Sequence, residues 1–526
     1  MNSNWKAAAA GLGIAFTISA FAKPVTWWAS YPVKPGEHIL VSGGGWTKDV
    51  KVRLAGRHLD PTTVSETGVT FKWPAEMTEP MPAVVLEDAE GASKPIVLNA
   101  PTVWWAQGDD FDASSPGSAI RFFGRCLEVG KAEFIGSDGS VTPLKVAQRD
   151  VWSCTAEIPK DVKPGSYAVR LDGRETDLVW RVKVPENLWG DKVFKVVDFG
   201  AVPDDGKDDD KAVHAAIDAA KAAGGGTVLF PRGRIEVHSK LVLPPHVRLK
   251  GVSRDVSGLH WQDFFDPPDR LVTGEHTFGI EDLFLTCGLC RQGIRPNALP
   301  THDIYLKRLR LRFITDQWRD NERSDDYSDF LRRYNMPGHA IQVYRGSRVW
   351  LEDVDVYWDK NSPGAMTVGP RLEINATDVV LRNCSSRGFG FCRFSIRRAL
   401  VENNDFEHTT ISIVPATRDM FWSRNRLFDR YSGDREAITQ DLRSNAYVDY
   451  QPAGVVDGVN VRMIVPETVG YSYAFGKNPG WNRLEEWNGG NIQIVAGRGL
   501  GQVRQIVKAV SKTEYVIDRP FDLEPD

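Results

Sequence analysis

Residues 198–234 read DFGAVPDDGKDDDKAVHAAIDAAKAAGGGTVLFPRGR. Small apolar side chains recur at helical spacing in the middle of this stretch, at Ala212, Ala216, Ile217 and Ala220. A triple glycine follows, and Thr227–Phe230 is then a short β-branched and aromatic run closed by a proline. The stretch therefore predicts a strand, an acidic turn, one amphipathic helix and a second strand, so that a single helix covers the end of a sheet.

This motif resembles the one that opens the solenoid in the pectate-lyase superfamily, the right-handed parallel β-helix proteins. The resemblance implies that the helix, expected at about 208–223, covers the open first coil of a β-helix. It also implies that the protein is carbohydrate-active and has a polysaccharide or oligosaccharide as its partner.

The aspartates and glycines of the motif have two interpretations each. Clustered carboxylates can bind calcium, whereas acidic residues at a helix start offset the helix dipole and cap free amides. We favour the capping role for Asp204, Asp205 and 208–210. Residues 224–226 follow a helix rather than precede one, so they are interpreted as a helix terminator and not as a phosphate loop.

Length and charge narrow the class of protein. A chain of 526 residues is too long for one compact core, but a solenoid grows by repetition. The net charge is −4, and acidic and basic residues are spread along the chain. We therefore expect no nucleic-acid partner.

The first residues predict export. Lys6 lies in a short basic lead, Ala7–Ala20 is apolar, and a small-residue cleavage motif ends at Ala22. We expect a signal peptide over 1–22, cleavage after Ala22, a secreted or periplasmic protein and no stable membrane insertion after cleavage. An uncleaved anchor is the alternative.

Six cysteines are too few for a disulfide-built scaffold of this size. Export permits disulfides, and Cys126 with Cys154 is the expected bridge. Cys287 and Cys290 have metal-knuckle spacing but lack a second pair of ligands. The remaining two, Cys384 and Cys392, are expected to be buried or locally bridged.

Two β modules precede the solenoid. Residues 23–100 and 101–187 alternate short strands with Pro, Gly and Asp turns, which is typical of immunoglobulin-like β-sandwiches. Each module opens with a tryptophan pair, at 27–28 and 104–105. These rings could stack on sugars, although packing between modules is the commoner role and the one we favour.

The coils can be recognised within the sequence, because stacked coils repeat a core pattern. The pattern apolar, any, apolar, any, turn residue, apolar recurs through residues 247–404, and a weaker copy ends at Asn425. The predicted turn residues are Gly251, Asp282, Arg308, Asp353, Asn383, Asn403 and Asn425. Apart from the arginine, these residue types best tolerate a left-handed backbone. The three asparagines predict a ladder of stacked amides.

Two polar, aromatic-rich insertions interrupt the coils, at 316–338 and 466–490. Loops that leave a rigid scaffold often build binding surfaces. A small β-meander is expected at about 488–520, within a β-helix domain over 192–526. Because no cap follows the last predicted strand, we expect the chain to be C-terminally incomplete.

The strongest candidate site is YSGDREAITQD, at 431–441. Asp434 and Glu436 are two residues apart, so their carboxylates share one face of an extended strand. Paired carboxylates suit glycoside hydrolysis, whereas elimination from a uronic acid needs a base and a cation. We predict that these two residues are catalytic and that Tyr431, Arg435 and Asp441 bind substrate. A surface loop with a structural Asp-Arg pair is the alternative.

Other candidates are isolated. His408 is expected to carry a proton in catalysis or to bind sugar, and His339 has the same status. Trp481 and Trp487 are predicted to bind substrate. Asp353, Asp355 and Asp359 could form a calcium site, but the first fits the turn column, so we expect no metal and no cofactor. Three arginines are candidates for the cation of an elimination by residue type alone: Arg393, Arg397 and Arg398.

We therefore predict an all-β protein with two immunoglobulin-like β-sandwich modules followed by a right-handed single-stranded parallel β-helix. The favoured activity is glycoside hydrolysis in a groove of the β-helix. A polysaccharide lyase and a non-catalytic glycan-binding or adhesive protein are the alternatives.

Overall fold

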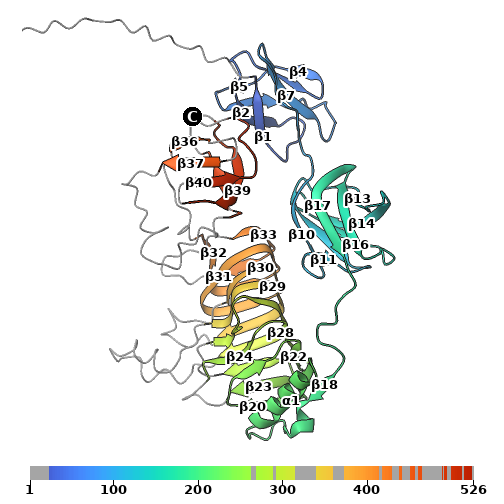
Figure 1. The fold of residues 1–526 in the computed structure, drawn as a ribbon, viewed down its shortest axis with the longest axis vertical. Coiled ribbons are helices and arrows are strands. Elements are labelled where there is room, and N and C mark those ends of the chain that lie inside the picture. The colour runs from blue at the N-terminus through green and yellow to red at the C-terminus, as the bar shows by residue number, and fades with distance from the viewer. Residues whose placement is uncertain are drawn as a thin grey trace, which may run out of the picture. The chain divides into compact units, whose positions relative to one another are not determined.

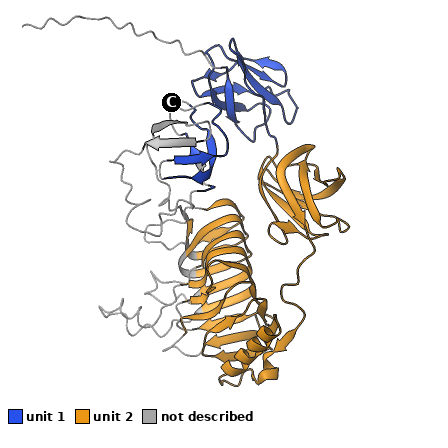
Figure 2. Ribbon diagram, in the orientation of Figure 1, with its two compact units in different colours: residues 1–100, 447–526 blue, residues 101–446 orange. Residues whose placement is uncertain are grey.

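The structure is a computed structural model. It describes residues 23–261, 268–287, 292–313, 339–358, 372–413, 417–428, 438–440, 451–455, 460–464, 488–489, 491–494, 499–511 and 514–523. The chain divides into two compact units (Figure 2): unit 1 contains 1–100 and 447–526, and unit 2 contains 101–446. The predicted signal peptide lies outside the described residues.

The first β module belongs to unit 1 and has two antiparallel sheets. One sheet contains β1 (Val25–Ala29), β2 (His38–Gly44), β6 (Gly68–Lys72) and β5 (Thr63–Val64), in that order. The other contains β4 (Arg57–Leu59), β3 (Lys51–Leu54), β7 (Ala83–Asp88), β8 (Gly91–Ala92) and β9 (Ile96–Val97), the last paired with β7. Alternate side chains of both sheets share one buried core, because successive residues of a strand point to opposite faces.

The second β module opens unit 2. Its strands are β10 (Thr102–Gly108), β11 (Ala113–Ser114), β12 (Ala119–Arg125), β13 (Ala132–Ile135), β14 (Val141–Arg149), β15 (Ser153–Glu157), β16 (Gly165–Leu171) and β17 (Arg174–Val182). Their spatial order is β10-β12-β15-β14-β13-β16-β17-β11. The all-β prediction is confirmed, whereas the immunoglobulin-like topology of both modules stays a prediction.

The predicted disulfide in this module is wrong. Cys126 and Cys154 are both free thiols. Cys154 is fully buried in the module core, and burial raises its pKa to about 11. Cys126 follows β12 with a φ of 55° and is not part of that core. The left-handed turn therefore directs the two side chains to different surroundings.

Unit 2 continues as a parallel solenoid. It begins with β18 (Val193–Lys195), the 3₁₀ turn η1 (Val196–Phe199) and α1 (Asp210–Ala222). The coils follow as β19 (Gly226–Leu229), β20 (Gly233–Val237), β21 (Leu241–Leu243), β22 (Val247–Lys250), β23 (Ser257–Trp261), β24 (Arg270–Gly274), β25 (Phe278–Glu281), β26 (Phe284–Cys287), β27 (Gln292–Ile294), β28 (Thr301–Phe313), β29 (His339–Trp358), β30 (Leu372–Arg382), β31 (Ser385–Glu402), β32 (Asp405–Ile413), β33 (Arg418–Ser423), β34 (Arg426–Phe428) and β35 (Ile438–Gln440). Figure 1 shows these strands stacked along one axis, with α1 at the end that carries β18.

Parallel pairing from coil to coil produces three faces. The first face contains β19, β22 and β25, and later 304–307, 349–352, 379–382, 399–402 and 420–423. The second contains β20, β23 and β26, and later 310–313, 355–357, 385–387, 405–407 and β34. The third contains β21, β24 and β27, and later 339–343, 372–376, 393–397, 411–413 and β35.

The helix α1 buries the predicted face, with Ala212, Ala216, Ile217 and Ala220 all in the core. The capping role of the aspartates is wrong for Asp209, which precedes the helix but makes no side-chain cap. Its Oδ1 accepts from the Val202 amide at 2.9 Å, and the Asp204 Oδ1 accepts from the Arg234 amide at 2.8 Å. These carboxylates therefore fasten backbone segments around the first coil instead of capping α1.

The glycine terminator is confirmed. Gly224, Gly225 and Gly226 have φ values of 80°, 137° and 150°, which residues with a side chain rarely adopt.

The predicted core pattern is confirmed as a first-face column of paired residues: Val247, Phe278, Ile304, Val349, Val379 and Ala399. Turn residues Asp282, Arg308, Asp353, Asn383 and Asn403 have φ values between 51° and 57°, so this part of the turn column is also confirmed. Gly251 and Asn425 do not have positive φ. Arg424, with a φ of 53°, takes the last place in the column.

The asparagine ladder is formed by Asn404 and Asn425, so the prediction is confirmed for Asn425 and wrong for Asn383 and Asn403. Asn404 is fully buried, and its Oδ1 accepts from the Cys384 amide at 2.9 Å. Its Nδ2 donates to the Leu381 carbonyl at 3.0 Å and to the Asn425 Oδ1 at 2.9 Å. The turn residues Asn383 and Asn403 point elsewhere because a left-handed residue turns its side chain out of the coil. The inward position after the turn needs an amide because the neighbouring backbone groups are buried.

The second module covers part of the first face within unit 2. Trp105 and Phe123 pack on Leu400 and Phe421, and Phe111 packs in a second cluster with Trp350, Val380 and Tyr305. Arg121 and Glu402 form an ion pair at 2.9 Å, and Arg348 pairs with Asp110 and, at 2.6 Å, with Asp303.

The described residues after β35 form an antiparallel sheet in unit 1. Its order is β36 (Gln451–Val455), β37 (Asn460–Ile464), β40 (Glu514–Ile517), β39 (Val503–Ala509) and β38 (Asn491–Gln493). The meander strands appear where the sequence predicted them, but no further coils appear among these residues, where a β-helix to 526 was expected. No helix in the described part of the chain has the length and apolarity needed to cross a membrane.

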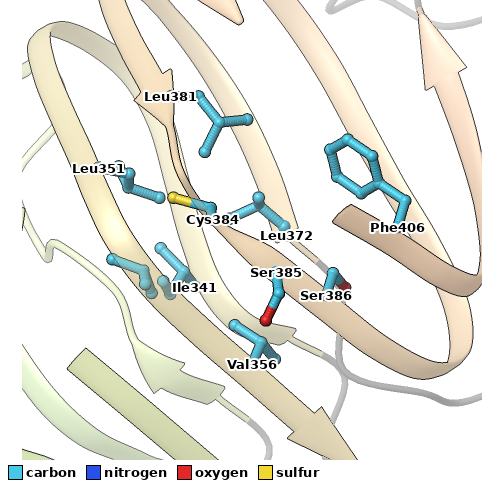
Figure 3. Close-up of a pocket in the computed structure, with 10 residues that line it drawn as sticks. Ile341, Leu351, Val356, Leu372, Leu381, Cys384, Ser385, Ser386 and Phe406 are labelled. Atoms are coloured by element: carbon cyan, nitrogen blue, oxygen red, sulfur yellow. The ribbon is translucent and has the colours of Figure 1, made fainter. Parts of the chain in front are cut away.

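A cavity inside the coils is a packing feature. It is lined by side chains from several coils, among them Ile341, Leu351 and Phe406 (Figure 3). Cys384 and Ser386 also line it, and burial raises the pKa of the Cys384 thiol to about 12. Its lining is mostly apolar, as expected of a gap between packed side chains.

Candidate functional site

At one corner of the solenoid, between the second and third faces, the number of residues in the connection varies most from coil to coil. The connections from the second face to the third include 262–267, 288–291, 314–338, 359–371 and 429–437, which lie outside the described residues. The described side chains beside this corner are consequently the best candidates for a site, because variable connections on a rigid scaffold tend to carry function.

A polar ladder crosses the third face beside this corner. Arg270 Nε donates to Gln292 Oε1 at 3.1 Å, and Gln292 Nε2 donates to Gln342 Oε1 at 3.0 Å. Gln342 Nε2 donates in turn to Glu373 Oε2 at 2.6 Å. The ladder thus runs from a guanidinium to a carboxylate across β24, β27, β29 and β30, which pair in parallel from one coil to the next. Every amide points the same way, so the bonds reinforce one another.

Glu373 is the end of the ladder and joins it to a histidine. The Glu373 Oε2 lies 2.8 Å from His339 Nε2. Burial alone would raise the pKa of Glu373, but the hydrogen bonds from His339 and Gln342 outweigh it and lower the pKa. The Glu373 side chain is 10% exposed and therefore largely buried, whereas that of His339 is 16% exposed and partly reaches the surface.

A cation completes the cluster. Arg393 lies beside Glu373 in register on β31, and its Nη1 is 3.5 Å from Glu373 Oε1. Its side chain is 42% exposed, which leaves much of the guanidinium within reach of a ligand. We call Arg270, Gln292, His339, Gln342, Glu373 and Arg393 the third-face cluster.

The third-face cluster has the parts of a proton-transfer site. A histidine that shares one ring nitrogen with a carboxylate presents the other as a base, and the carboxylate fixes the orientation of the ring. An exposed guanidinium can pair with a substrate carboxylate in a planar, two-pronged contact. Because Glu373 is held as an anion by two donors, it suits orientation of the histidine better than donation of a proton.

The second face presents a row of charges across the same corner. Arg310 and Asp355 lie 3.9 Å apart, and Asp355 accepts from the Ser385 hydroxyl. Farther along, Arg426 contacts Asp405 at 2.5 Å, and this contact lowers the pKa of Asp405. These carboxylates are thus matched by cations or a hydroxyl.

Two of the three aspartates considered as calcium ligands are described by the structure, and both contact cations or a hydroxyl group of the protein. Asp353 pairs with Arg254 at 2.9 Å, and Asp355 faces Arg310 and Ser385. Asp359 lies outside the described residues. The prediction that no metal or cofactor is used stays a prediction.

Most sequence-predicted site residues lie outside the described part of the chain, namely Tyr431, Asp434, Arg435, Glu436, Asp441, Trp481 and Trp487. His408 falls on β32, but its side chain is not described. Among the lesser candidates, His339 and Arg393 meet at Glu373. Arg398 instead pairs with Asp378 at 2.6 Å in a turn, and Arg397 lies in register with Arg418.

Sequence reasoning missed Glu373, Gln342, Gln292 and Arg270. A usable signal was present for two of them. Leu372-Glu373-Ile374 and Ile341-Gln342-Val343 each place a polar residue between two apolar ones, the pattern of an outward position on a buried strand. The coil-to-coil register that aligns them was not recognised on this face.

Comparison with known proteins agrees with this fold. Residues 193–283 match the family model described as rhamnogalacturonase A/epimerase, pectate lyase-like. The chain is 32% identical over 166 residues to the mannuronan C5-epimerase AlgE1 of Azotobacter vinelandii, covering 28% of this chain and 11% of that protein. It is 36% identical over 103 residues to alginate lyase 7 of the same organism, covering 17% and 12%. The chain thus spans about a tenth of the length of these relatives.

Among solved structures, an exopolygalacturonase from Thermotoga maritima is similar with a TM-score of 0.37 and 11% identity, over 49% of this chain and 70% of that one. The A-module of the mannuronan C-5 epimerase AlgE6 of Azotobacter vinelandii has a TM-score of 0.27 and 20% identity, over 45% and 56%. The family match begins at β18, covers α1 and extends into the coils whose parallel pairing is described above. The match over residues 193–283 therefore confirms the resemblance of the entry motif to the pectate-lyase-like, right-handed parallel β-helix superfamily.

Proposed function

We propose that this protein is an exported enzyme that acts on a uronic-acid polysaccharide by removing the proton next to the sugar carboxylate. The observation that carries the proposal is the contact of His339 with Glu373, at 2.8 Å, beside the partly exposed Arg393. The names of the matched relatives, mannuronan C5-epimerases and an alginate lyase, support a uronate substrate.

Each residue has a distinct role in this reaction. Arg393 binds the sugar carboxylate and stabilises the charge that develops on it. The His339 nitrogen that does not face Glu373 takes the proton from C5, and the electron pair of the broken C–H bond moves into the carboxylate. Glu373 orients the imidazole and stabilises its protonated form, and Gln342 holds Glu373.

Two outcomes are open to the resulting carbanion. In elimination, the electron pair forms a C4–C5 double bond, the C4–O bond breaks, and the leaving oxygen takes a proton. In epimerisation, C5 takes a proton on its opposite side and no bond of the chain is broken. We favour elimination, since it is the alternative that the sequence already raised.

Hydrolysis by Asp434 and Glu436 is the second candidate. It is supported by the sequence, in which the two carboxylates have the spacing of an acid–base pair on one face of a strand. Hydrolysis does not require a base next to the sugar carboxylate. The described cluster offers one carboxylate that is already held by two donors, so it is poorly suited to a hydrolytic acid–base pair.

Product analysis separates these chemistries. Purified protein is incubated with alginate, polygalacturonate and a neutral glucan, and ultraviolet absorbance of unsaturated uronate is compared with new reducing ends. We expect both signals to rise together on a uronate polymer. His339→Ala should reduce the rate about 10²–10⁴-fold, as expected for loss of a general base.

His214 provides a matched control. It is a partly buried histidine on α1 whose Nε2 lies 2.7 Å from the Ser239 hydroxyl, far in sequence from the cluster. His214→Ala should retain full activity. Reducing ends without unsaturated product, together with full activity of His339→Ala, would contradict the proposal and favour hydrolysis.

A further inference from the structure

Two tryptophans of the second module lie exposed beside each other. Trp104 on β10 is 53% exposed, and Trp152, in the turn before β15, is 46% exposed. Their ring centroids are 6.5 Å apart and the ring planes are tilted by 33°. Exposed apolar side chains that lie together, rather than singly, can mark a binding surface.

A β-bulge determines which tryptophan of the 104–105 pair faces outward. The register of β10 on β12 shifts between Val103 and Trp105, so Trp104 is the extra residue. Bulges re-aim side chains. Trp105 consequently packs on Phe123 and Leu400, whereas Trp104 turns away from that cluster. The packing role predicted for the pair thus holds for only one of its members.

A glycine on the middle strand lets the two rings meet. Gly124 lies opposite Val103 on one side, and its amide donates to the Trp152 carbonyl at 3.0 Å on the other. A Cβ at Gly124 would lie 1.9 Å from the Thr102 carbonyl oxygen, so only glycine fits there. The middle strand therefore places no side chain between the two indoles.

The turn that carries Trp152 is held rigidly. Asp150 Oδ1 accepts from the Trp152 and Ser153 amides at 2.7 and 2.8 Å, and Asp150 Oδ2 accepts from the Ser153 hydroxyl at 3.0 Å. A turn that is already fixed loses little backbone entropy when a ligand binds. The backbone that carries Trp152 therefore need not rearrange on binding.

We propose that Trp104 and Trp152 form a binding platform for the apolar face of a pyranose in a polysaccharide chain. A sugar ring has a C–H face that matches an indole face and hydroxyl groups at its edge that need polar neighbours. Such neighbours are present: Arg125 lies one residue past Gly124 and donates to the Thr102 hydroxyl at 3.2 Å. Two indoles bordered by polar residues are too small for a stable protein interface, which buries about 1,200 Å² or more.

This platform is separate from the third-face cluster, since it is built from β10, β12 and the turn before β15. It would hold a polymer chain on the enzyme without taking part in the reaction. The proposal consequently stands or fails independently of the chemistry assigned to His339.

Affinity electrophoresis of the full chain tests the platform. Glu373→Gln is used as the background so that the polymer is not degraded, and gels contain alginate, polygalacturonate or a neutral β-glucan. We expect at least one polymer to retard the protein, and Trp104→Ala and Trp152→Ala each to weaken binding about tenfold. Trp104→Phe should retain most of the binding, because it keeps an aromatic face.

Val179→Ala is the matched control, because Val179 is 64% exposed in the same module but has no aromatic face. Retardation by alginate and polygalacturonate alone would identify an anionic chain as the ligand, whereas retardation by the glucan as well would identify the pyranose face itself. The proposal is overturned if no polymer retards the protein, if both alanine variants bind like Val179→Ala, or if they change only self-association in ultracentrifugation.

Discussion

Replacing Asn404 by alanine tests the asparagine ladder. The change removes the acceptor of the Cys384 amide and the donor to the Leu381 carbonyl, both at a fully buried position. Each buried backbone group left without a partner costs about 1–3 kcal/mol, so we expect a loss of about 2–6 kcal/mol in the free energy of unfolding. For a domain of this size, that corresponds to a decrease on the order of 10 °C in the β-helix transition seen by scanning calorimetry.

Asn403→Gly is the control. Asn403 has a φ of 55°, which glycine adopts without strain, and the change removes one hydrogen bond, from Arg424 Nε at 2.8 Å. We expect it to change stability by less than about 1 kcal/mol. If Asn403→Gly destabilises the β-helix as much as Asn404→Ala, the ladder is at the position that the sequence predicted and our register is wrong.

Four further outcomes are expected. Glu373→Gln should lower the rate about 10²-fold or more in steady-state assays, because His339 loses its anionic partner. The pKa of Glu373 is lower in the folded protein than in the unfolded chain, so the ionised side chain stabilises the fold. This stabilisation should be complete above the unfolded pKa of about 4.3 and should be lost as the pH falls through the folded pKa. Acid unfolding of wild type and Glu373→Gln should therefore converge at low pH, and a constant difference would contradict this. Arg348→Ala, which leaves Asp303 without its 2.6 Å partner, should lower the free energy of unfolding by about 2 kcal/mol and speed limited proteolysis of the segment between module and coils. The Cys384 thiol should resist maleimide until the coils unfold, and rapid labelling of the native protein would contradict its burial.

The coil architecture was predictable because it rests on local patterns. The helix that covers the first coil, the terminating glycines and the turn residues from Asp282 to Asn403 each follow from spacing and backbone preference. Asn425 was assigned to the turn column as well as to the ladder, because asparagine suits both a left-handed turn and a buried ladder, and only the ladder assignment is right. Only the coil-to-coil contacts show that Arg424 takes the turn and Asn425 the ladder.

The third-face cluster could not be predicted in the same way. Arg270, Gln292, Gln342 and Glu373 are far apart in sequence and meet only through parallel pairing of successive coils. The connections between those strands differ in length from coil to coil. The sequence therefore has no fixed period that would show which residues of successive coils are paired. His339 and Arg393 were recognised by residue type, but the carboxylate that links them was not.

The most direct test of the proposed chemistry is exchange of the proton next to the sugar carboxylate. The enzyme is incubated with a uronate polymer in D₂O, and C5 is followed by NMR together with the C4–C5 double bond. Wild type should lose the C5 proton signal, by elimination or by uptake of deuterium, and His339→Ala should do so about 10²–10⁴-fold more slowly. Cleavage of the polymer with the C5 proton fully retained would contradict the account.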